Sequence, residues 1–369
     1  MNKKVGIVTW HKNGNFGGTL QAYALMKTVE ELGYQPEFID YQPDHSVMKS
    51  IIRKLKNAVV LLLYPLSAKS RAHIWEFVRS RMPESPLLTS LKELVEYTTS
   101  QYDACICGSD QIWSLVGKLE PAYFLSFCPK AKRIAYAPSI GLSEVSDSNR
   151  EFFRQHVSSI PFLSVREKRG VEIIKELTSL EAELVADPCI LRTATQWRKF
   201  ASKKLKSEEY ILCYFIGIND RYLEIGKKLG QEYGLPLKFV SSKRVKYDRR
   251  CGEQVPCDLP EFVSMFDNAK YILTDSYHGL IFSLILEKDF GVFERFSLDD
   301  PLNQNSRIYS LLSVLGDEEA IIVDAETADS VLHRIRSLED INNKLQEFRS
   351  KSICYLERSL DIATSTVLK

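Results

Sequence analysis

Short apolar runs alternate with amphipathic stretches at the start of the chain. Residues 5–9 are strand-like, and 11–18 (HKNGNFGG) form a glycine-rich loop. Residues 19–32 then carry apolar side chains at helical spacing before Gly33, and 36–41 are strand-like again. Because strand, helix and strand in this order make a βαβ unit, the pattern predicts a parallel sheet.

The same pattern continues and then restarts after Pro188. Further strands are predicted at 102–108, 133–136, 163–165 and 184–186, and a second series at 210–215, 237–241, 271–273 and 290–293. We therefore expect an α/β fold with an N-terminal domain at residues 1–188 and a second α/β domain at 189–340. Residues 341–369 are expected to form a helix that crosses back to the first domain.

One polar motif lies where a predicted strand meets a helix. TDSYHG, residues 274–279, follows the strand-like 271–273 and precedes an apolar run typical of a buried helix. Ligands of open α/β sheets bind beyond the carboxyl ends of strands, and unpaired helix N–H groups favour an anion there. The motif predicts a site for a phosphorylated substrate that includes Ser276, His278 and Gly279. The alternative is that its hydroxyl and carboxylate side chains only cap the helix.

Composition narrows the class of protein. The chain has 369 residues, 44% hydrophobic and 26% charged, with a net charge of +1. These values suit a two-domain globular protein and lack the basic field of a nucleic-acid binder. The short apolar stretch 5–10 does not indicate a signal peptide, and no apolar run reaches the ~18 residues of a membrane span, so we expect a cytoplasmic protein. The eight cysteines show no CxxC spacing, so neither disulfides nor a structural metal is expected.

A basic segment at residues 49–81 interrupts the first domain. It contains eight basic residues and one acid, Glu76, beside apolar residues at helical spacing. A basic amphipathic helix is typical of contact with an anionic membrane surface, which would place the protein at the inner face of the cell membrane. The alternative is a helix whose apolar side packs on the sheet.

Ordered sequence blocks resemble the polysaccharide pyruvyl transferase family. From position 5 to about position 315, the blocks are VGIVTWHKNGNFGGTLQAYALMKTVEELGYQPEFIDY, CICGSDQIW, RIAYAPSIG, SVREKRGVEIIKEL, ADPCILRT, FVSMFDNAKYILTDSYHGLIFSLIL and NSRIYSLL. Two positions depart from the family: Tyr277, where Phe is frequent, and Pro138, where a small residue is frequent. Tyr277 keeps the aromatic ring and should be tolerated, whereas Pro138 is expected to alter the local turn.

The resemblance implies an architecture and a reaction. It implies two Rossmann-like domains facing across a cleft, as in the GT-B architecture. The reaction moves the enolpyruvyl carbons of phosphoenolpyruvate onto two hydroxyls of a sugar, forms a cyclic ketal and releases phosphate. The acceptors are saccharides of cell-surface polymers, in some members carried on a lipid diphosphate. Phosphoenolpyruvate is a substrate in this scheme, and no cofactor is expected.

The donor site is expected to combine a general acid with cationic groups. His278 is the candidate acid for the donor's methylene carbon, since imidazole exchanges protons near neutral pH. Arg166 and Arg307, with Arg295 as a third candidate, suit a phosphate and a carboxylate, and Arg166 is also a catalytic candidate. Ser276 and the N–H groups near Gly279 would hold phosphate oxygens without a metal.

The acceptor site is expected along the loops that follow the first strands. Asp110 would orient or deprotonate a sugar hydroxyl, with turn capping as the alternative. The first glycine loop lacks GxGxxG spacing, which argues against a dinucleotide site. The residues expected to contact the saccharide are His11, Asn13, Asn15, Gly17, Gln111 and Ser139.

Two other functions remain open on sequence grounds. The same architecture would support a glycosyltransferase that uses a nucleotide-sugar, and a non-catalytic saccharide-binding protein would share the cleft. Retention of both His278 and Arg166 argues against the binding protein. A cysteine nucleophile at Cys105 or Cys107 is disfavoured because neither has an identifiable base.

Overall fold

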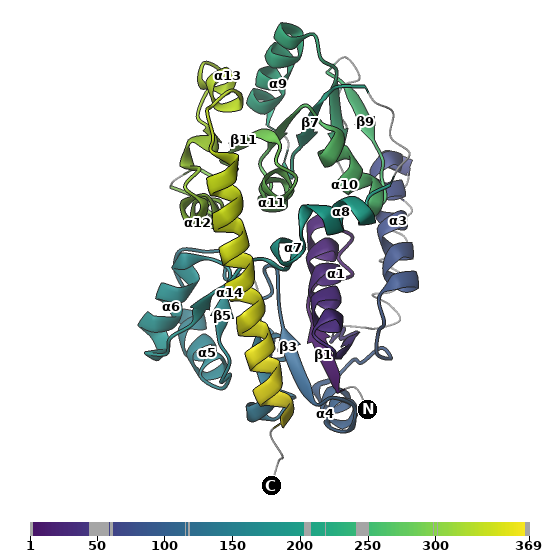
Figure 1. Ribbon diagram of the computed structural model, residues 1–369. Coiled ribbons are helices and arrows are strands. Elements are labelled where there is room, and N and C mark those ends of the chain that lie inside the picture. Colours follow the sequence, from purple (N-terminus) through teal and green to yellow (C-terminus); the bar gives the residue numbers. More distant parts are fainter. Residues whose placement is uncertain are drawn as a thin grey trace.

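The protein folds into two α/β units that lie one above the other in the computed structural model (Figure 1). The structure describes residues 3–43, 59, 62–114, 116, 119–202, 208–217, 219–240, 251–297, 299–300 and 302–365.

The N-terminal unit is built on a parallel sheet in the order β2-β1-β3-β4. Its strands are β1 (Lys4–Val8), β2 (Gln35–Phe38), β3 (Ala104–Cys107) and β4 (Arg133–Ala135), followed by the two-stranded pair β5 (Ser164–Val165) and β6 (Glu183–Leu184). Its helices are α1 (Phe16–Glu31), α3 (Pro65–Arg81), α4 (Leu91–Gln101), α5 (Asp147–Val157) and α6 (Lys168–Thr178), with short 3₁₀ turns η1 (Pro121–Phe124) and η2 (Lys130–Lys132). The parallel sheet predicted from the first βαβ pattern is confirmed.

The C-terminal unit is built on a larger parallel sheet in the order β12-β11-β10-β7-β8-β9. Its strands are β7 (Ile211–Tyr214), β8 (Leu237–Val240), β9 (Glu253–Val255), β10 (Tyr271–Thr274), β11 (Asp289–Phe293) and β12 (Ile321–Ile322). Its helices are α9 (Asp220–Tyr233), α10 (Leu259–Asn268), α11 (Tyr277–Ile285), α12 (Ser306–Leu315) and α13 (Thr327–Leu332), with the 3₁₀ turn η3 (Glu318–Ala320).

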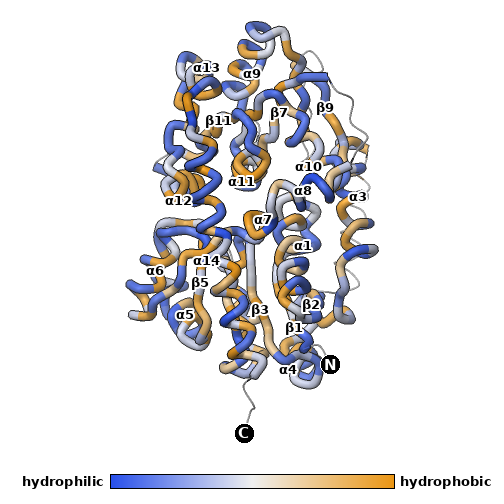
Figure 2. The backbone as a smooth tube through the Cα atoms, viewed as in Figure 1, coloured by the Kyte–Doolittle hydropathy of each residue, from blue (hydrophilic) through white to orange (hydrophobic). Residues whose placement is uncertain are grey.

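Three helices join the two units. α7 (Pro188–Leu191) and α8 (Ala194–Phe200) lie at the junction, and the long α14 (Leu338–Ser365) runs along both units (Figure 1). α14 is tied to the N-terminal unit because Ser352 Oγ accepts the Ala186 N–H and Tyr355 donates to the Ala135 carbonyl. α7 and α11 are among the most hydrophobic segments, and both lie at the centre of the molecule (Figure 2). One buried cluster therefore continues through both units.

Two helices begin where a side chain caps them. α1 begins at Phe16, earlier than the predicted residue 19, because Asn15 Oδ1 accepts the Gly17 N–H. α11 begins at Tyr277, because Ser276 Oγ accepts the Gly279 N–H. His278 therefore lies in the first turn of α11 rather than in a loop before it.

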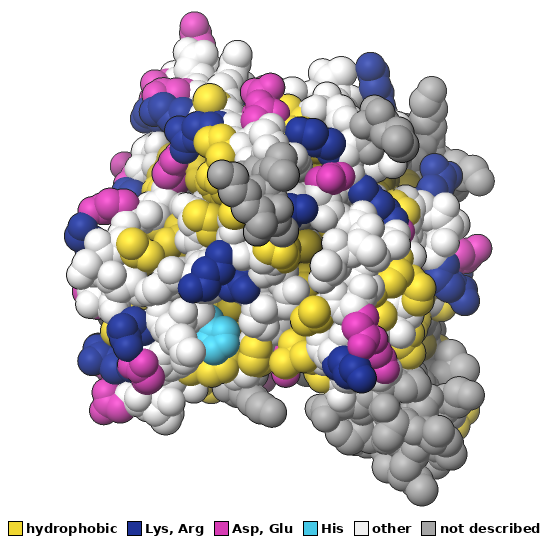
Figure 3. Space-filling model, turned by 90° about the horizontal axis from the view of Figure 1, so that it is seen from below, with side chains coloured by type: hydrophobic (Ala, Val, Ile, Leu, Met, Phe, Trp, Pro, Cys, Tyr) yellow, Lys and Arg dark blue, Asp and Glu magenta, His cyan; other side chains and the backbone are white. Residues whose placement is uncertain are grey.

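The basic segment 49–81 is described only in part. Residues 44–58, 60 and 61 lie outside the described residues, including Arg53, Lys54 and Lys56. Within α3, Ile74 and Val78 are buried in the core, so this helix packs on the protein. On the face shown in Figure 3, basic and acidic side chains are interspersed rather than separated by sign. Within the described part of the chain, no helix is long and apolar enough to cross a membrane.

All eight cysteines are free thiols, and all except Cys354 are buried. Cys105 and Cys107 lie inside β3, where burial raises the pKa of the Cys107 thiol and a hydrogen bond together with burial raises that of Cys105. For Cys105 the neighbour is Cys128, whose hydrogen bond is the largest cause. Thiols held in the protonated form do not act as nucleophiles, which argues against the cysteine mechanism.

Candidate functional site

A cavity of about 420 Å³ lies where the carboxyl edges of the two sheets face each other. From the N-terminal unit it is lined by residues that follow β1 and β3: Trp10, Asn13, Asn15, Asp110 and Gln111. From the C-terminal unit it is lined by residues that follow β7, β10 and β11 or begin α12: Ile216, Gly217, Asp275, Ser276, Tyr277, His278, Arg295, Phe296, Gln304, Asn305, Arg307 and Ile308.

Strand order explains why the cavity forms there. In the first sheet the order reverses between β1 and β3, and in the second between β7 and β10. Loops diverge at such a switch point and leave a crevice beyond the strand ends. Both crevices open into the same cavity, so this is the candidate active site.

A chain of charged side chains connects the two units beneath the cavity. Arg166 donates from Nη1 to Asp187 Oδ2 at 2.6 Å and from Nη2 to Asp110 Oδ1 at 3.3 Å. Asp187 Oδ2 also lies 3.6 Å from His278 Nε2. The charges along this chain of contacts therefore alternate when the imidazole is protonated, in the order Asp110, Arg166, Asp187, His278.

Burial and pairing fix the charges of this chain. Burial alone would raise the pKa of Asp187, but His278 and Arg166 outweigh it and hold that pKa well below its usual range. Burial alone would lower the pKa of Arg166, but Asp187 and Asp110 outweigh it and raise that pKa above its ordinary value. Both groups are therefore ionised at neutral pH.

Arg166 does not line the cavity. Its side chain is fully buried, it pairs with two carboxylates, and its guanidinium stacks 4.6 Å from the centre of the Tyr277 ring. These contacts occupy the guanidinium with protein groups, so it holds neighbouring side chains of the site in place. Direct contact of Arg166 with a donor anion stays a prediction, and the geometry favours an indirect role.

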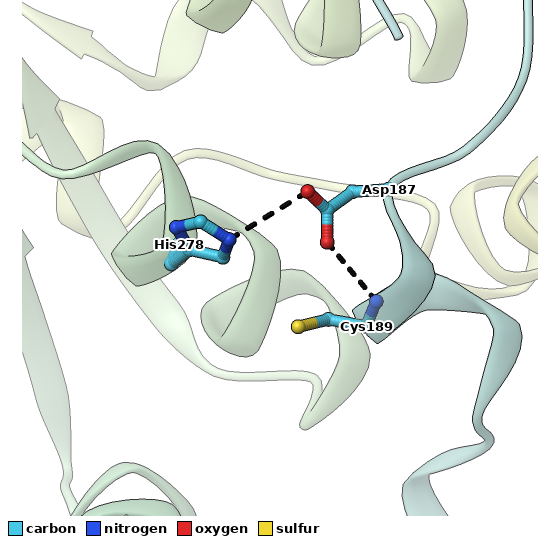
Figure 4. A group of neighbouring side chains, drawn as sticks. All are labelled: Asp187, Cys189 and His278. Carbon is cyan, nitrogen blue, oxygen red and sulfur yellow. Dashed lines mark hydrogen bonds and ion pairs between the residues drawn. The ribbon is translucent and has the colours of Figure 1, made fainter. Parts of the chain in front are cut away.

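His278 presents its two ring nitrogens to different surroundings. Nε2 points toward the Asp187 carboxylate (Figure 4). It is buried and has no hydrogen-bond partner among the described residues. On the other side, a Cβ added to Gly17 would overlap Nδ1 and Cγ of the ring. Gly17 therefore leaves room for the imidazole and need not touch the saccharide.

Asp187, Cys189 and His278 form the one described group with ligand atoms close enough to share a metal ion. These atoms lie within 4.8 Å of one another (Figure 4). Two features oppose a metal there. The guanidinium of Arg166 already occupies Asp187 Oδ2, and burial together with Asp187 raises the pKa of the Cys189 thiol well above its ordinary value, whereas a metal needs the thiolate. We interpret the group as part of the ion-pair network.

Two arginines supply positive charge to the cavity. Within the described residues, neither Arg295 nor Arg307 forms an ion pair. Instead, Arg307 Nη2 and Arg295 Nη2 donate to the same amide oxygen, Gln304 Oε1, at 3.1 and 3.4 Å. Burial, together with repulsion from Arg166, lowers the pKa of Arg307 to about 10, so it stays charged at neutral pH. Desolvated and lacking a carboxylate, this pair is a candidate anion site.

Side chains of the TDSYHG motif do cap helix α11, as the alternative interpretation of the sequence predicted. Ser276 Oγ accepts the Gly279 N–H at 3.3 Å, and Thr274 Oγ1 accepts the Ser276 N–H at 3.1 Å. A Cβ on Gly279 would overlap Thr274 Oγ1, so this glycine serves close packing. Ser276 still lines the cavity beside His278, but the Gly279 N–H is already bound.

The expected acceptor residues divide into two groups. Asn13, Asn15 and Gln111 line the cavity, as does Asp110, whose φ of 63° places it in the left-handed region that Asp tolerates. His11 and Ser139 do not reach it. His11 Nε2 bonds to Glu84 at 2.6 Å, and Ser139 Oγ donates to the buried Glu167 at 3.0 Å.

Asp187 and Gln304 belong to the site but were not among the candidates from the sequence. Asp187 was visible only as the residue that ends a strand before proline, and its contacts come from residues distant in sequence. Gln304 carries no motif signal, yet it contacts Arg295, Arg307 and, across the cavity, Gln111 Nε2 at 2.7 Å. Its position next to the NSRIYSLL block was the only available indication.

Solved structures similar to this chain share its two-domain architecture. The Staphylococcus aureus MnaA–UDP co-structure aligns with a TM-score of 0.54 at 14% identity and covers 98% of each chain. The UDP-N-acetylglucosamine 2-epimerase of Rickettsia bellii gives 0.53 at 11% identity, over 100% of this chain and 99% of its own. The Methanocaldococcus jannaschii UDP-GlcNAc 2-epimerase, in complex with UDP-GlcNAc and UDP, gives 0.52 at 13%, over 94% and 99%. At these identities the likeness shows the fold alone, and the predicted GT-B architecture is confirmed.

The family comparison reaches further. A comparison with curated proteins gave no match. The model of the polysaccharide pyruvyl transferase family matches residues 15–295 of the 369, which include the ends of β3, β7, β10 and β11 at the cavity and the TDSYHG motif. The chain belongs to the polysaccharide pyruvyl transferase family.

Proposed function

We propose that this protein transfers a pyruvyl group from phosphoenolpyruvate to two hydroxyls of a saccharide, forming a cyclic ketal and releasing phosphate. One observation carries the proposal. The imidazole of His278 and the guanidinium groups of Arg295 and Arg307 line the same cavity, and both arginines lack a carboxylate partner in the described part of the chain.

The anionic groups of the donor suit the two arginines. Phosphoenolpyruvate carries a phosphate and a carboxylate, and Arg295 and Arg307 offer planar donors for both. Burial lowers the pKa of each guanidinium, which means that each gains from an incoming negative charge. The first turn of α11, after its Ser276 cap, adds the positive end of a helix dipole on the same side.

The reaction requires one proton donor and a route for the hydroxyl protons. His278 would give a proton to the terminal methylene carbon, which becomes the methyl group, and a sugar hydroxyl would attack C2. Asp110 would take the proton of that hydroxyl, since it lines the cavity and Arg166 holds its Oδ1. A second hydroxyl then displaces phosphate from C2, and its proton leaves with that phosphate, which closes the ketal.

The saccharide would lie against the N-terminal side of the cavity. Asn13, Asn15 and Gln111 present amide groups there, and Trp10 adds an aromatic ring. Such a combination suits sugar hydroxyls and the apolar face of a pyranose.

The proposal extends to location in the cell. The excess of basic residues in 49–81 supports peripheral binding to the inner face of the cell membrane, at about 1 kcal/mol for each Lys or Arg near an anionic surface. α3 packs on the protein, so this role would fall to the more N-terminal part of the segment.

A nucleotide-sugar transferase is the second candidate function. It is favoured by the UDP and UDP-GlcNAc complexes among the structural neighbours. It would need no proton donor for a carbon atom, so His278 would have another role in that reaction.

Mass spectrometry separates the candidates. Candidate glycans are incubated with phosphoenolpyruvate and the protein, and the products are searched for the added mass of a pyruvyl ketal. Transfer of a sugar from a nucleotide-sugar instead, with no pyruvylated product from any acceptor, would overturn the proposal.

A further inference from the structure

We infer that Asp187 is a positioning residue that holds Nε2 of His278, so that Nδ1 is the nitrogen that transfers the proton, and that Gly17 provides the space for this. The inference deepens the proposed function and rests on it.

Asp187 is fixed on every side except the one facing His278. It caps α7, with Oδ1 accepting the Cys189 N–H at 3.0 Å and Pro188 setting the first turn. Its Oδ2 is held by Arg166 at 2.6 Å. The side chain is 0% exposed, so solvent cannot replace the remaining partner. The carboxylate therefore presents a rigid acceptor to the imidazole.

The position of Nε2 beside the Asp187 carboxylate favours the form of the imidazole that carries a proton on Nε2. Nε2 is buried and lies 3.6 Å from Asp187 Oδ2. A lone pair on Nε2 would face the carboxylate oxygen and be repelled, whereas an N–H would be attracted. Hydrogen bonds of this kind are often long before substrate binds and shorten in the complex. With Nε2 protonated in both charge states, only Nδ1 can gain and lose the exchanged proton.

Gly17 explains how Nδ1 is accommodated. It is the second residue of α1, in the N-terminal unit, whereas His278 belongs to α11 of the C-terminal unit. A Cβ at position 17 would overlap Nδ1 and Cγ of the ring. A side chain there would push the ring away from Asp187 or cover Nδ1. Gly17 and Asp187 therefore fix the same imidazole from opposite sides.

Two variants test the two contacts separately. In Asp187→Asn the side-chain amide no longer demands a proton on Nε2, so the ring adopts both tautomers. We expect kcat with phosphoenolpyruvate to fall by at least about 100-fold, the lower range of what a general acid supplies, with little change in KM. Gly17→Ala leaves Asp187 intact and should cause a comparable loss.

Matched controls separate positioning from stability. Asp317 is a buried carboxylate that pairs with Arg334 at 2.8 Å away from the cavity. Asp317→Asn therefore removes a similar ion pair and should leave kcat near the parent value. Gly226→Ala is the control for Gly17, since its new Cβ would meet neighbours only at ordinary contact distances of 3.5–3.8 Å.

A measurement without substrate keeps the inference independent of the proposed reaction. Nitrogen-15 spectra of histidine-labelled protein report which ring nitrogen carries the proton, with His278→Gln identifying the signal. We expect the Nε2–H form in the parent and a mixture in Asp187→Asn. An Nδ1–H form in the parent, or kcat in both Asp187→Asn and Gly17→Ala no lower than in their controls, would overturn the inference. Absence of any phosphoenolpyruvate turnover in the parent would overturn the proposed function and leave the tautomer result standing.

Discussion

Replacing Gln304 by glutamate should weaken binding of phosphoenolpyruvate, because the new carboxylate would compete with the donor for Arg295 and Arg307. Gln304 Oε1 accepts from Arg307 at 3.1 Å and from Arg295 at 3.4 Å, the positions that we propose for an anionic oxygen of the donor. The amide thus stands where the ligand would bind. A carboxylate at this position would pair with both guanidinium groups, and the donor would have to displace it.

The size of the effect follows from the two hydrogen bonds. A bond to a neutral acceptor contributes about 0.5–1.5 kcal/mol and one to a charged acceptor about 1.5–3 kcal/mol. The change therefore adds about 1–1.5 kcal/mol for each bond, or about 2–3 kcal/mol for the pair. At about 1.4 kcal/mol per factor of ten, the KM for phosphoenolpyruvate should rise about 30- to 150-fold, while kcat at saturating donor changes much less.

Initial rates of phosphate release against phosphoenolpyruvate concentration give this KM directly. Gln304→Ala is the matched control, because it removes the amide without adding a charge and should raise KM by no more than a few-fold. Thermal unfolding of both variants establishes that they are folded. An unchanged KM in folded Gln304→Glu would show that the donor's anionic groups bind elsewhere.

The remaining predictions concern the acid, the second cation, acid stability and the membrane. His278→Gln should lower turnover by about 10²–10⁴-fold with a smaller change in donor affinity, and near-normal turnover would refute its role as the acid. Arg307→Lys keeps the charge but loses the planar fork, so titration calorimetry should show weaker donor binding, and equal affinity would count against it. Because the pKa of Asp187 is depressed in the folded state, its stabilisation is present above its unfolded pKa of about 3.9 and is lost as pH falls below that value. Unfolding curves of Asp187→Asn should lack this part of the acid dependence, and identical pH profiles would contradict the assignment. Cosedimentation with anionic vesicles should occur at low salt and weaken as salt is raised, and binding should be lost when glutamate replaces Arg53, Lys54 and Lys56. Binding that survives these changes, or no binding at low salt, would favour the packed-helix interpretation for the whole segment.

Much of the fold follows from local sequence patterns. The alternation of short apolar strands with amphipathic helices was enough to predict parallel α/β units, because each βαβ step is a local feature. Helix starts were less accurate. Asn15 and Ser276 both act as caps, and whether a polar residue before a helix caps it or faces a ligand depends on the tertiary environment.

The site was predicted in part. His278, Asp110 and Arg307 come together at the cavity, because each follows a strand or begins a helix at the same edge of its sheet. Arg166 was expected there but pairs with Asp187 outside the cavity lining. This pairing could not be predicted, because Asp187 lies 21 residues further along the chain and no pattern indicates which arginine a buried carboxylate will bind. Gln304 went unnoticed for the same reason, because its contacts with both arginines exist only in the folded cavity.

Phosphate release from phosphoenolpyruvate, measured in parallel with nucleoside diphosphate release from nucleotide-sugars and with the same saccharide acceptor, tests the central claim most directly. The account predicts that the parent releases phosphate from phosphoenolpyruvate only when acceptor is present and that His278→Gln nearly abolishes this release. Turnover of a nucleotide-sugar in its place, with phosphoenolpyruvate left intact, would contradict it.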